Sequence, residues 1–99
     1  MNQFLRAIVF FAMVGASSAG WAAESGQHLY QMHCANCHGI TGIPVMPQVP
    51  NLAMREGMNK PDFVLIQSLK TGGRSKPPFL GILTDKELQD VIQYVRMMR

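Results

Sequence analysis

The sequence predicts an all-α domain of three to four short helices joined by long loops. Apolar residues recur with helical spacing near the end of the chain, at Leu88, Val91, Ile92 and Val95. No segment alternates polar and apolar residues with the period of two that indicates a β-strand. Glycines and prolines gather in residues 39–51, which favours a loop there. Together these patterns exclude a sheet and leave helices connected by irregular segments.

Residues 1–23 have the organisation of a secretory signal peptide. A positively charged start precedes the apolar run 7–16, and small residues follow it. The run is shorter than the ~18–20 residues that a transmembrane helix needs, which disfavours an uncleaved membrane anchor. We therefore expect cleavage after Ala22 or Ala23, export, and a mature domain of residues 24–99 without stable membrane insertion.

The mature segment is too short for a Rossmann domain, a barrel or a two-domain enzyme, and a chain of this size usually needs a staple. Its eight Lys and Arg against six Asp and Glu give a net charge of +2, too weak to indicate a nucleic-acid partner. Its two cysteines, Cys34 and Cys37, are only three positions apart, so a disulfide between them would stabilise little. Some other group must hold the fold together.

The sequence Cys34-Ala35-Asn36-Cys37-His38 carries the strongest chemical signal in the chain. C-x-x-C-H is the attachment signature of c-type haem. Two thiols at this spacing reach the two vinyl groups of one haem, and the imidazole that follows is an axial ligand of the iron. We expect one covalently bound haem c, which would also supply the apolar centre that short helices cannot provide alone.

Three other interpretations of the motif are weaker. A thioredoxin-like dithiol needs a βαβ context that this chain lacks. A zinc site needs about four ligands, and only His28 and His33 lie near the cysteines. Both histidines are better explained as exposed residues of a helix. The third alternative is a chance occurrence of the motif on a structural turn.

Over residues 26–96 the chain resembles the small monohaem class I cytochromes c of bacterial periplasms. The matching pieces occur in the family's order: Gly26, Tyr30, Cys34 to Gly39, Pro50-Asn51-Leu52, Leu69 to Gly72, Pro77-Pro78-Phe79, Leu83 to Leu88 and Tyr94-Val95. The resemblance implies a periplasmic electron carrier, not an enzyme, in which Cys34 and Cys37 attach the haem and His38 is the proximal iron ligand. It also implies that the Pro50 carbonyl accepts a hydrogen bond from the imidazole.

The first helix of the mature chain is expected to run from Glu24 or Ser25 to His33, with Gly26 leaving room for a close helix crossing. Residues 52–58 are expected to form a short helical turn.

The central helix is expected to begin near Asn59 or Lys60, with Pro61 in its first turn, and to end at Gly72-Gly73. The residues expected on its apolar face are Phe63, Leu65, Ile66 and Leu69.

The last helix is expected to begin after Thr84, which forms a capping box with Glu87. Its apolar positions are those of the helical repeat noted above. Tyr30 and Tyr94 are expected to serve helix–helix packing, not electron relay. The residues expected on its solvent side are Asp85, Lys86, Gln89, Asp90, Gln93 and Arg96.

The sixth iron ligand is where this chain departs from the family that it resembles. Relatives place a methionine before the proline of the distal loop, and the ungapped match puts Lys76 there. An amine must lose its proton before it binds iron, which costs ~4–5 kcal/mol at neutral pH from a pKa of about 10.4. Burial beside the haem and bond formation could offset that cost.

Lys76 is therefore the first candidate, and Met58 and Met54, neutral thioethers that precede the central helix, are the next. Met46 ranks below them because its loop normally packs on the proximal side. The remaining alternative is an open sixth position, which would suit a protein that binds or senses NO or CO. A further alternative is a haem subunit of a larger periplasmic dehydrogenase.

Charge is uneven along the chain. Residues 55–76 contain five basic residues and two acidic ones, a local net charge of +3: Arg55, Lys60, Lys70, Arg74 and Lys76 against Glu56 and Asp62. In the family that the chain resembles, this segment borders the haem edge. We therefore expect redox protein partners with acidic docking patches.

Overall fold

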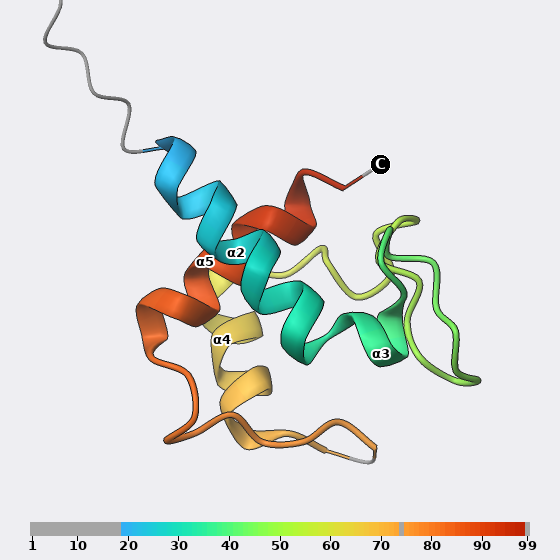
Figure 1. Ribbon diagram of the computed structural model, residues 1–99. Helices are drawn as coiled ribbons and strands as arrows, with labels where there is room; N and C mark the ends of the chain where they lie inside the picture. Colours follow the sequence, from blue (N-terminus) through green and yellow to red (C-terminus); the bar gives the residue numbers. More distant parts are fainter. Residues whose placement is uncertain (1–18, 74, 99) are drawn as a thin grey trace, which may run out of the picture.

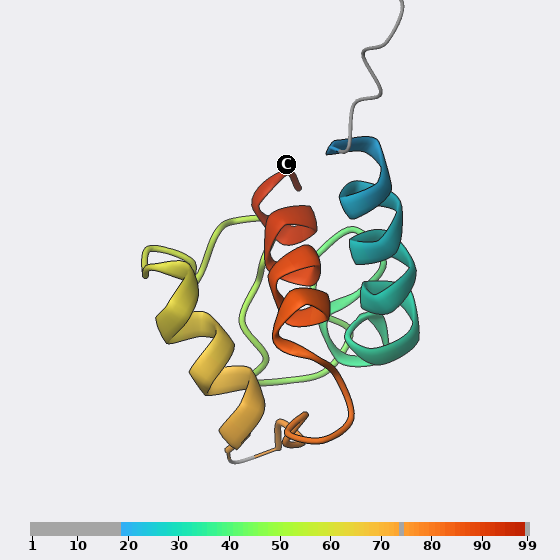
Figure 2. The ribbon, with the colours of Figure 1, turned by 90° about the vertical axis from the view of Figure 1, so that its left-hand side faces the viewer.

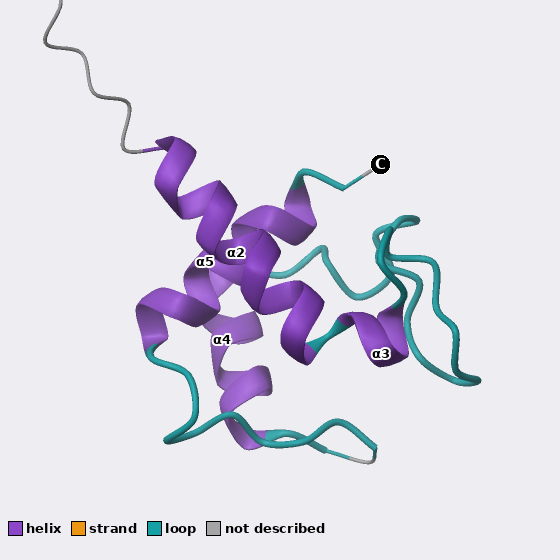
Figure 3. Cartoon of the chain, viewed as in Figure 1, coloured by secondary structure: helices purple, strands orange, loops and turns teal. Residues whose placement is uncertain are grey.

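The structure is a computed structural model that describes residues 19–73 and 75–98 (Figure 1). It contains four helices in these ranges: α2 (Ala19–His33), α3 (Ala35–His38), α4 (Asp62–Thr71) and α5 (Asp85–Arg96). Figure 3 shows helices and loops but no strand in these ranges. An isolated β-bridge joins Gly73 and Lys76. The all-α prediction is confirmed. Most of the expected signal peptide lies outside the described residues.

None of the helices in the described ranges combines the length and the apolar character needed to cross a bilayer.

Helix α5 lies between α2 and α4 (Figure 2) and packs on both. It crosses α2 closely at Gly26, where an added Cβ would lie 2.2 Å from the carbonyl oxygen of Asp90. Next to this point the ring of Tyr30, which is fully buried, packs on Tyr94 with 5.5 Å between ring centroids. The structure thus confirms the close crossing at Gly26 and the role of both tyrosines in helix packing, and it shows that the two rings contact each other.

Two features at the start of the chain differ from expectation. Helix α2 begins at Ala19, before the expected start, because Ala22 and Ala23 are good helix formers and continue the helix through the expected cleavage site. The one-turn helix α3 was not predicted. The His38 amide donates to the Cys34 carbonyl at 2.9 Å, so the motif itself forms this turn.

Helix α4 begins at Asp62, after the expected start. Pro61 takes the N-cap position with extended backbone, because a residue that precedes a proline, here Lys60, is sterically disfavoured from the helical region. The helix ends at Gly72, as expected, with φ of 70° there. The prediction that Phe63 lies on the apolar face is wrong, because the residue is 69% exposed. The side of α4 that faces the core carries Leu65, Ile66 and Leu69, which are partly buried.

The capping box of α5 is present: the Glu87 amide donates to Thr84 Oγ1 at 3.1 Å, and the Thr84 amide donates to Glu87 Oε1 at 2.9 Å. All four predicted apolar residues are buried. The prediction of which α5 residues face solvent is wrong in part. Asp90 is only 6% exposed and pairs with Lys86 at 3.1 Å.

The polar side of α5 instead binds the segment that leads into α4. Arg96 donates to Asp62 Oδ1 from Nε at 2.9 Å, and to the carbonyls of Met58 and Lys60 at 3.0 and 2.7 Å. The Asp62 carboxylate also accepts from two amide side chains: Gln89 Nε2 at 2.7 Å and Gln93 Nε2 at 2.9 Å. The hydrogen bond from Gln89 and those from Arg96 lower the pKa of Asp62. This polar clamp fixes residues 58–62 against α5.

The long loop between α3 and α4 folds back on itself. The Leu52 amide donates to the Gly42 carbonyl at 2.9 Å, and a Cβ on Gly42 would lie 2.8 Å from the Ala53 nitrogen. Residues 52–57 form consecutive turns with bonds between residues three apart, such as Arg55 N to Leu52 O at 3.0 Å, instead of a regular helix. This fold brings Pro50 and Met58 back toward α3 and α5.

Replacing Gly26 tests the helix crossing. We expect Gly26→Ala to lower the free energy of unfolding by about 2 kcal/mol or more, because the new Cβ forces α2 away from the Asp90 backbone. Denaturant unfolding of the purified holoprotein measures the change. The exposed neighbour Gln27 supplies the control, since Gln27→Ala should change stability by less than about 0.5 kcal/mol. Equal stabilities for the two variants would contradict the crossing.

Candidate haem site

A cavity of about 590 Å³ lies among the helices and loops. Every helix contributes to its wall, and so do the loop before α4 and the loop after it. Much of the lining is apolar, including Leu52, Leu65, Leu69, Phe79, Val91, Ile92 and Val95. A cavity of this size and character suits a large apolar group with a few fixed polar contacts.

The residues of the C-x-x-C-H motif form one wall of this cavity. Cys34, Cys37 and His38 all line it, and both cysteines are free thiols. Burial raises the pKa of Cys34 to about 11, with a smaller contribution from Cys37. The Cys34 thiol is therefore neutral at physiological pH, and the two cysteines present their sulfurs to the cavity beside one imidazole. This donor set fits a haem held by two thioethers and one axial ligand.

His38 is held in one orientation. Its Nδ1 lies 3.1 Å from the Pro50 carbonyl oxygen, which can only accept, so the ring carries its proton on Nδ1. Burial lowers the pKa of His38, the Pro50 bond opposes this, and the charge of Lys76 lowers it further. The neutral ring keeps the Nε2 lone pair free for a metal, and the carbonyl fixes its direction.

Of the four distal candidates, three line the cavity and one does not. Lys76 and Met58 line it and are partly buried. Met46 also lines it, but its sulfur lies 3.5 Å from Cys37 Sγ, on the wall that carries the motif. Met54 is 74% exposed and is absent from the lining. The geometry therefore favours Lys76 and Met58 over the other two methionines.

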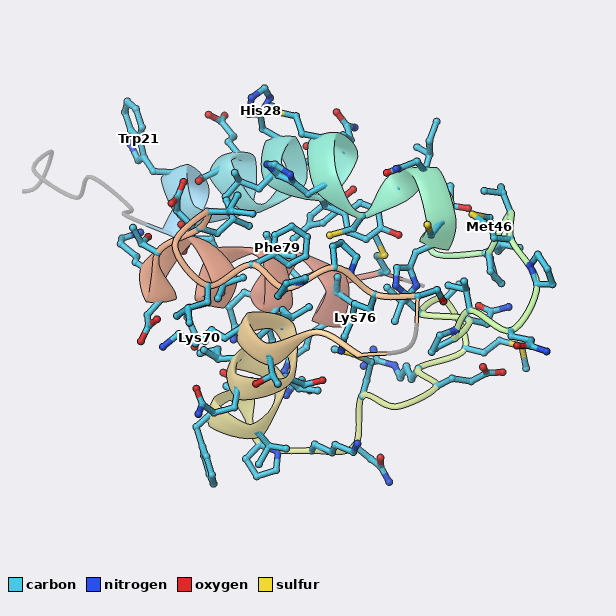
Figure 4. All side chains as sticks on the ribbon, turned by 90° about the horizontal axis from the view of Figure 1, so that it is seen from below. Trp21, His28, Met46, Lys70, Lys76 and Phe79 are labelled. Carbon is cyan, nitrogen blue, oxygen red and sulfur yellow. The ribbon has the colours of Figure 1, made fainter. Side chains whose placement is uncertain are left out.

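Lys76 lies on the loop after α4, between α4 and α3 in the view of Figure 4, whereas Met46 lies on the long loop at the edge of the molecule. The Lys76 ammonium donates to Ser68 Oγ at 2.6 Å. Burial lowers the pKa of Lys76, and the nearby charge of Lys60 lowers it further. Both effects reduce the cost of the neutral amine that a metal would require.

Two residues of the site were missed by sequence reasoning. Ser68 gave no signal, because a serine inside a helix is ordinary. His33 was expected to be exposed, like His28, but it lines the cavity with its ring centroid 5.7 Å from that of Phe79. Position in sequence could not show this, since the contact depends on how the distal loop folds over α2.

Fewer basic side chains of segment 55–76 are exposed and unpaired in the structure than the sequence suggests. Lys70 pairs with Asp85 at 2.6 Å, and Lys76 faces the cavity. Arg74 lies outside the described residues. The exposed basic residues that the structure describes in this segment are therefore Arg55 and Lys60, with Glu56 exposed beside them.

Known proteins with similar sequences and folds point to the same chemistry. Residues 22–95 match the model of the family described as cytochrome c oxidase, cbb3-type, subunit III. Cytochrome c6 of Thermosynechococcus vestitus is 33% identical over 94 residues, covering 90% of this chain and 83% of that protein. Cytochrome c6 of Parathermosynechococcus lividus is 35% identical over 74 residues, covering 72% of this chain and 84% of that protein.

Among solved structures, the KustC0563 c-type cytochrome is similar with a TM-score of 0.62 and 28% identity, covering 72% of this chain and 93% of that one. Family, relatives and fold agree with the cavity and its donor set. The chain belongs to the cytochrome c family, as a small monohaem class I cytochrome c: an electron-transfer protein with one covalently bound haem c, which passes electrons between redox partners.

Proposed function

We propose that this cytochrome is a periplasmic carrier of single electrons whose haem is bound by Cys34, Cys37 and His38. The observation that carries the proposal is the wall of the cavity on which two free thiols lie beside an imidazole oriented by a 3.1 Å contact with the Pro50 carbonyl. A bound haem supplies a one-electron Fe(III)/Fe(II) couple.

Each residue has a separate task in this mechanism. The sulfurs of Cys34 and Cys37 fix the haem covalently, which keeps a small domain from losing it. His38 Nε2 would hold the haem iron, while the Pro50 carbonyl holds the ring in place and raises its basicity. The apolar residues of the lining would limit the access of water to a bound haem, which is one determinant of its potential.

On the distal side, we assign the sixth ligand to Lys76 in preference to Met58. Lys76 lines the cavity, and burial lowers its pKa in the direction that ligation requires. Met58 stands second because its thioether also lines the cavity and needs no deprotonation.

Acidic partners would dock on the surface that carries Arg55 and Lys60. The exposed charges that the structure describes on this surface are few, so we expect a mild attraction in place of strong steering. A second surface adjoins Cys37 and is apolar: Ile40, Ile43 and Val45 are 70%, 59% and 69% exposed, and the Val45 amide donates to the Cys37 carbonyl at 3.0 Å. No Asp, Glu, Lys or Arg occurs in residues 25–54.

The first prediction concerns haem attachment. Denaturing gels of the expressed protein should stain for haem at the mass of the mature chain. Cys34→Ser or Cys37→Ser should weaken the stain, because each thiol supplies one of the two thioethers. His38→Ala should keep the stain but lose the low-spin spectrum. Met46→Leu, beside Cys37, is the matched control and should attach haem normally. Complete extraction of haem by acid acetone would contradict covalent binding.

The second prediction concerns the distal ligand. The ferric protein should lack the weak far-red absorption of an iron–methionine bond, and its potential should be low, since His/Met ligation is what raises the potential. Lys76→Ala should lose the low-spin state, whereas Met58→Leu and Met54→Leu should retain it. If Lys76→Ala retains the low-spin state and Met58→Leu loses it, the sixth ligand is the methionine and not the lysine.

Partner docking gives the third prediction. Electron transfer to an acidic partner should slow by about threefold as salt is raised, and Lys60→Glu should slow it at low salt by a similar factor. Stopped-flow kinetics over an ionic-strength series measure both. Gln27→Glu, at an exposed position of α2, adds a negative charge outside this surface and is the control that should have little effect. Rates that do not depend on salt would instead favour docking through the apolar surface beside Cys37.

The fourth prediction concerns export. The protein recovered from the periplasm should begin at Ala23 or Glu24, as Edman or mass analysis of its N-terminus would reveal. An N-terminus at Met1 in the membrane fraction would show that the segment is an anchor. Because the expected cleavage falls inside α2, the mature helix should still contain Gly26 and Tyr30 and so keep the crossing with α5.

A further inference from the structure

The loop that carries Lys76 is fixed to α4 by backbone hydrogen bonds. Phe79 N donates to Leu69 O at 3.0 Å, and Leu80 N donates to Lys70 O at 3.3 Å. Within the loop, Gly73 and Lys76 exchange two backbone bonds, of 3.0 and 2.7 Å. The position of the Lys76 backbone is therefore tied to the helix that runs beside it.

Gly72 makes this close packing possible. A Cβ at that position would lie 2.8 Å from both the Lys76 carbonyl oxygen and the Pro78 nitrogen. The loop consequently approaches the end of α4 more closely than a side chain would allow, which brings Lys76 within reach of the helix.

The Lys76 side chain then meets a single partner on α4. Its Nζ donates to Ser68 Oγ at 2.6 Å. Ser68 is the only polar residue among those that α4 contributes to the cavity lining, and its neighbours there are Leu65 and Leu69. The Ser68 hydroxyl therefore anchors the Lys76 amine at the wall of the cavity, on a stretch of α4 that is otherwise apolar there.

We propose that Ser68 is a positioning residue that orients the Lys76 amine toward the iron; the inference rests on the proposed function, in which Lys76 is the distal ligand. An amine that binds a metal through its lone pair keeps two N–H groups. Ser68 Oγ accepts from one of them, which fixes the rotation of the amine about its last bond and increases its donor strength. Pro50 plays the corresponding role for the proximal ligand, His38.

The test compares Ser68→Ala in two holoproteins, one with Lys76 and one carrying Lys76→Met. With Lys76 present, Ser68→Ala should raise the reduction potential and increase the affinity of the ferric iron for added imidazole by about tenfold, because a less well-held ligand is displaced more easily. In the Lys76→Met background both effects should vanish, since a thioether has no N–H to donate.

Two further variants separate positioning from general structure. Ser68→Thr keeps the hydroxyl and should restore the parent potential and imidazole affinity. Thr71→Ala removes a hydroxyl on the same helix that bonds the Gln67 carbonyl at 2.9 Å, and it should leave both quantities unchanged. Ser68→Ala should fold, because alanine is the better helix former.

The possible results separate a failure of the positioning role of Ser68 from a failure of the assignment of Lys76 as the distal ligand. If Lys76→Ala alters the spectrum but Ser68→Ala matches the parent, Ser68 does not position the ligand, while the distal assignment stands. If Ser68→Ala has the same effect in both backgrounds, its role is structural and the inference is wrong. If Lys76→Ala keeps the parent spectrum, the distal assignment fails and the role of Ser68 fails with it.

Discussion

The close crossing of α2 and α5 at Gly26 is the contact on which the remaining architecture depends. It brings the two helix backbones so near that only a glycine fits, and it pairs the rings of Tyr30 and Tyr94 beside the crossing. The Tyr30 hydroxyl then donates to the Gly39 carbonyl at 2.7 Å, which fixes the backbone directly after the C-x-x-C-H motif. The orientation of the haem-binding wall is thus set by a helix contact more than one turn away.

On the opposite side of the cavity, α4 is held mainly by polar contacts and not by a close helix crossing. Helix α4 has no fully buried residue, so apolar packing alone does not hold it. The Asp62 carboxylate and the Arg96 guanidinium connect its first turn to α5, and the distal loop bonds its last turn through the backbone. Such charge-assisted bonds are directional, whereas a small apolar contact can slide. The chain therefore positions Leu65, Ser68 and Leu69 around the cavity without closing the space that the haem needs.

In the proposed assignment, an amine from Lys76 takes the place that a methionine holds in the family that the sequence resembles. A thioether is a neutral, soft donor that raises the potential of a c-type haem. An amine competes with protons for its lone pair and is a harder donor, so its environment must favour the neutral form. In this structure burial and the neighbouring Lys60 both act in that direction, and Ser68 offers the amine an acceptor.

The sequence by itself determined the helical class, the haem motif and the last helix, because these signals are local. A capping box, a helical apolar repeat and two cysteines before a histidine each depend on residues within a few positions of one another. The resemblance to known cytochromes added Pro50, which the structure brings to 3.1 Å from His38 Nδ1 across twelve positions.

What only the tertiary structure decided depends on contacts between distant segments. Phe63 faces solvent and Asp90 is buried because the rotation of each helix is set by its neighbours, not by its own pattern. The same is true of Met54 and Met58, which are four positions apart and equally plausible as ligands in the sequence. Arg96, thirty-eight positions beyond Met58, binds the Met58 carbonyl and holds that residue at the cavity, while Met54 remains outside. No local rule relates these residues, since the bond forms only when α5 has packed and its polar side has met the segment before α4.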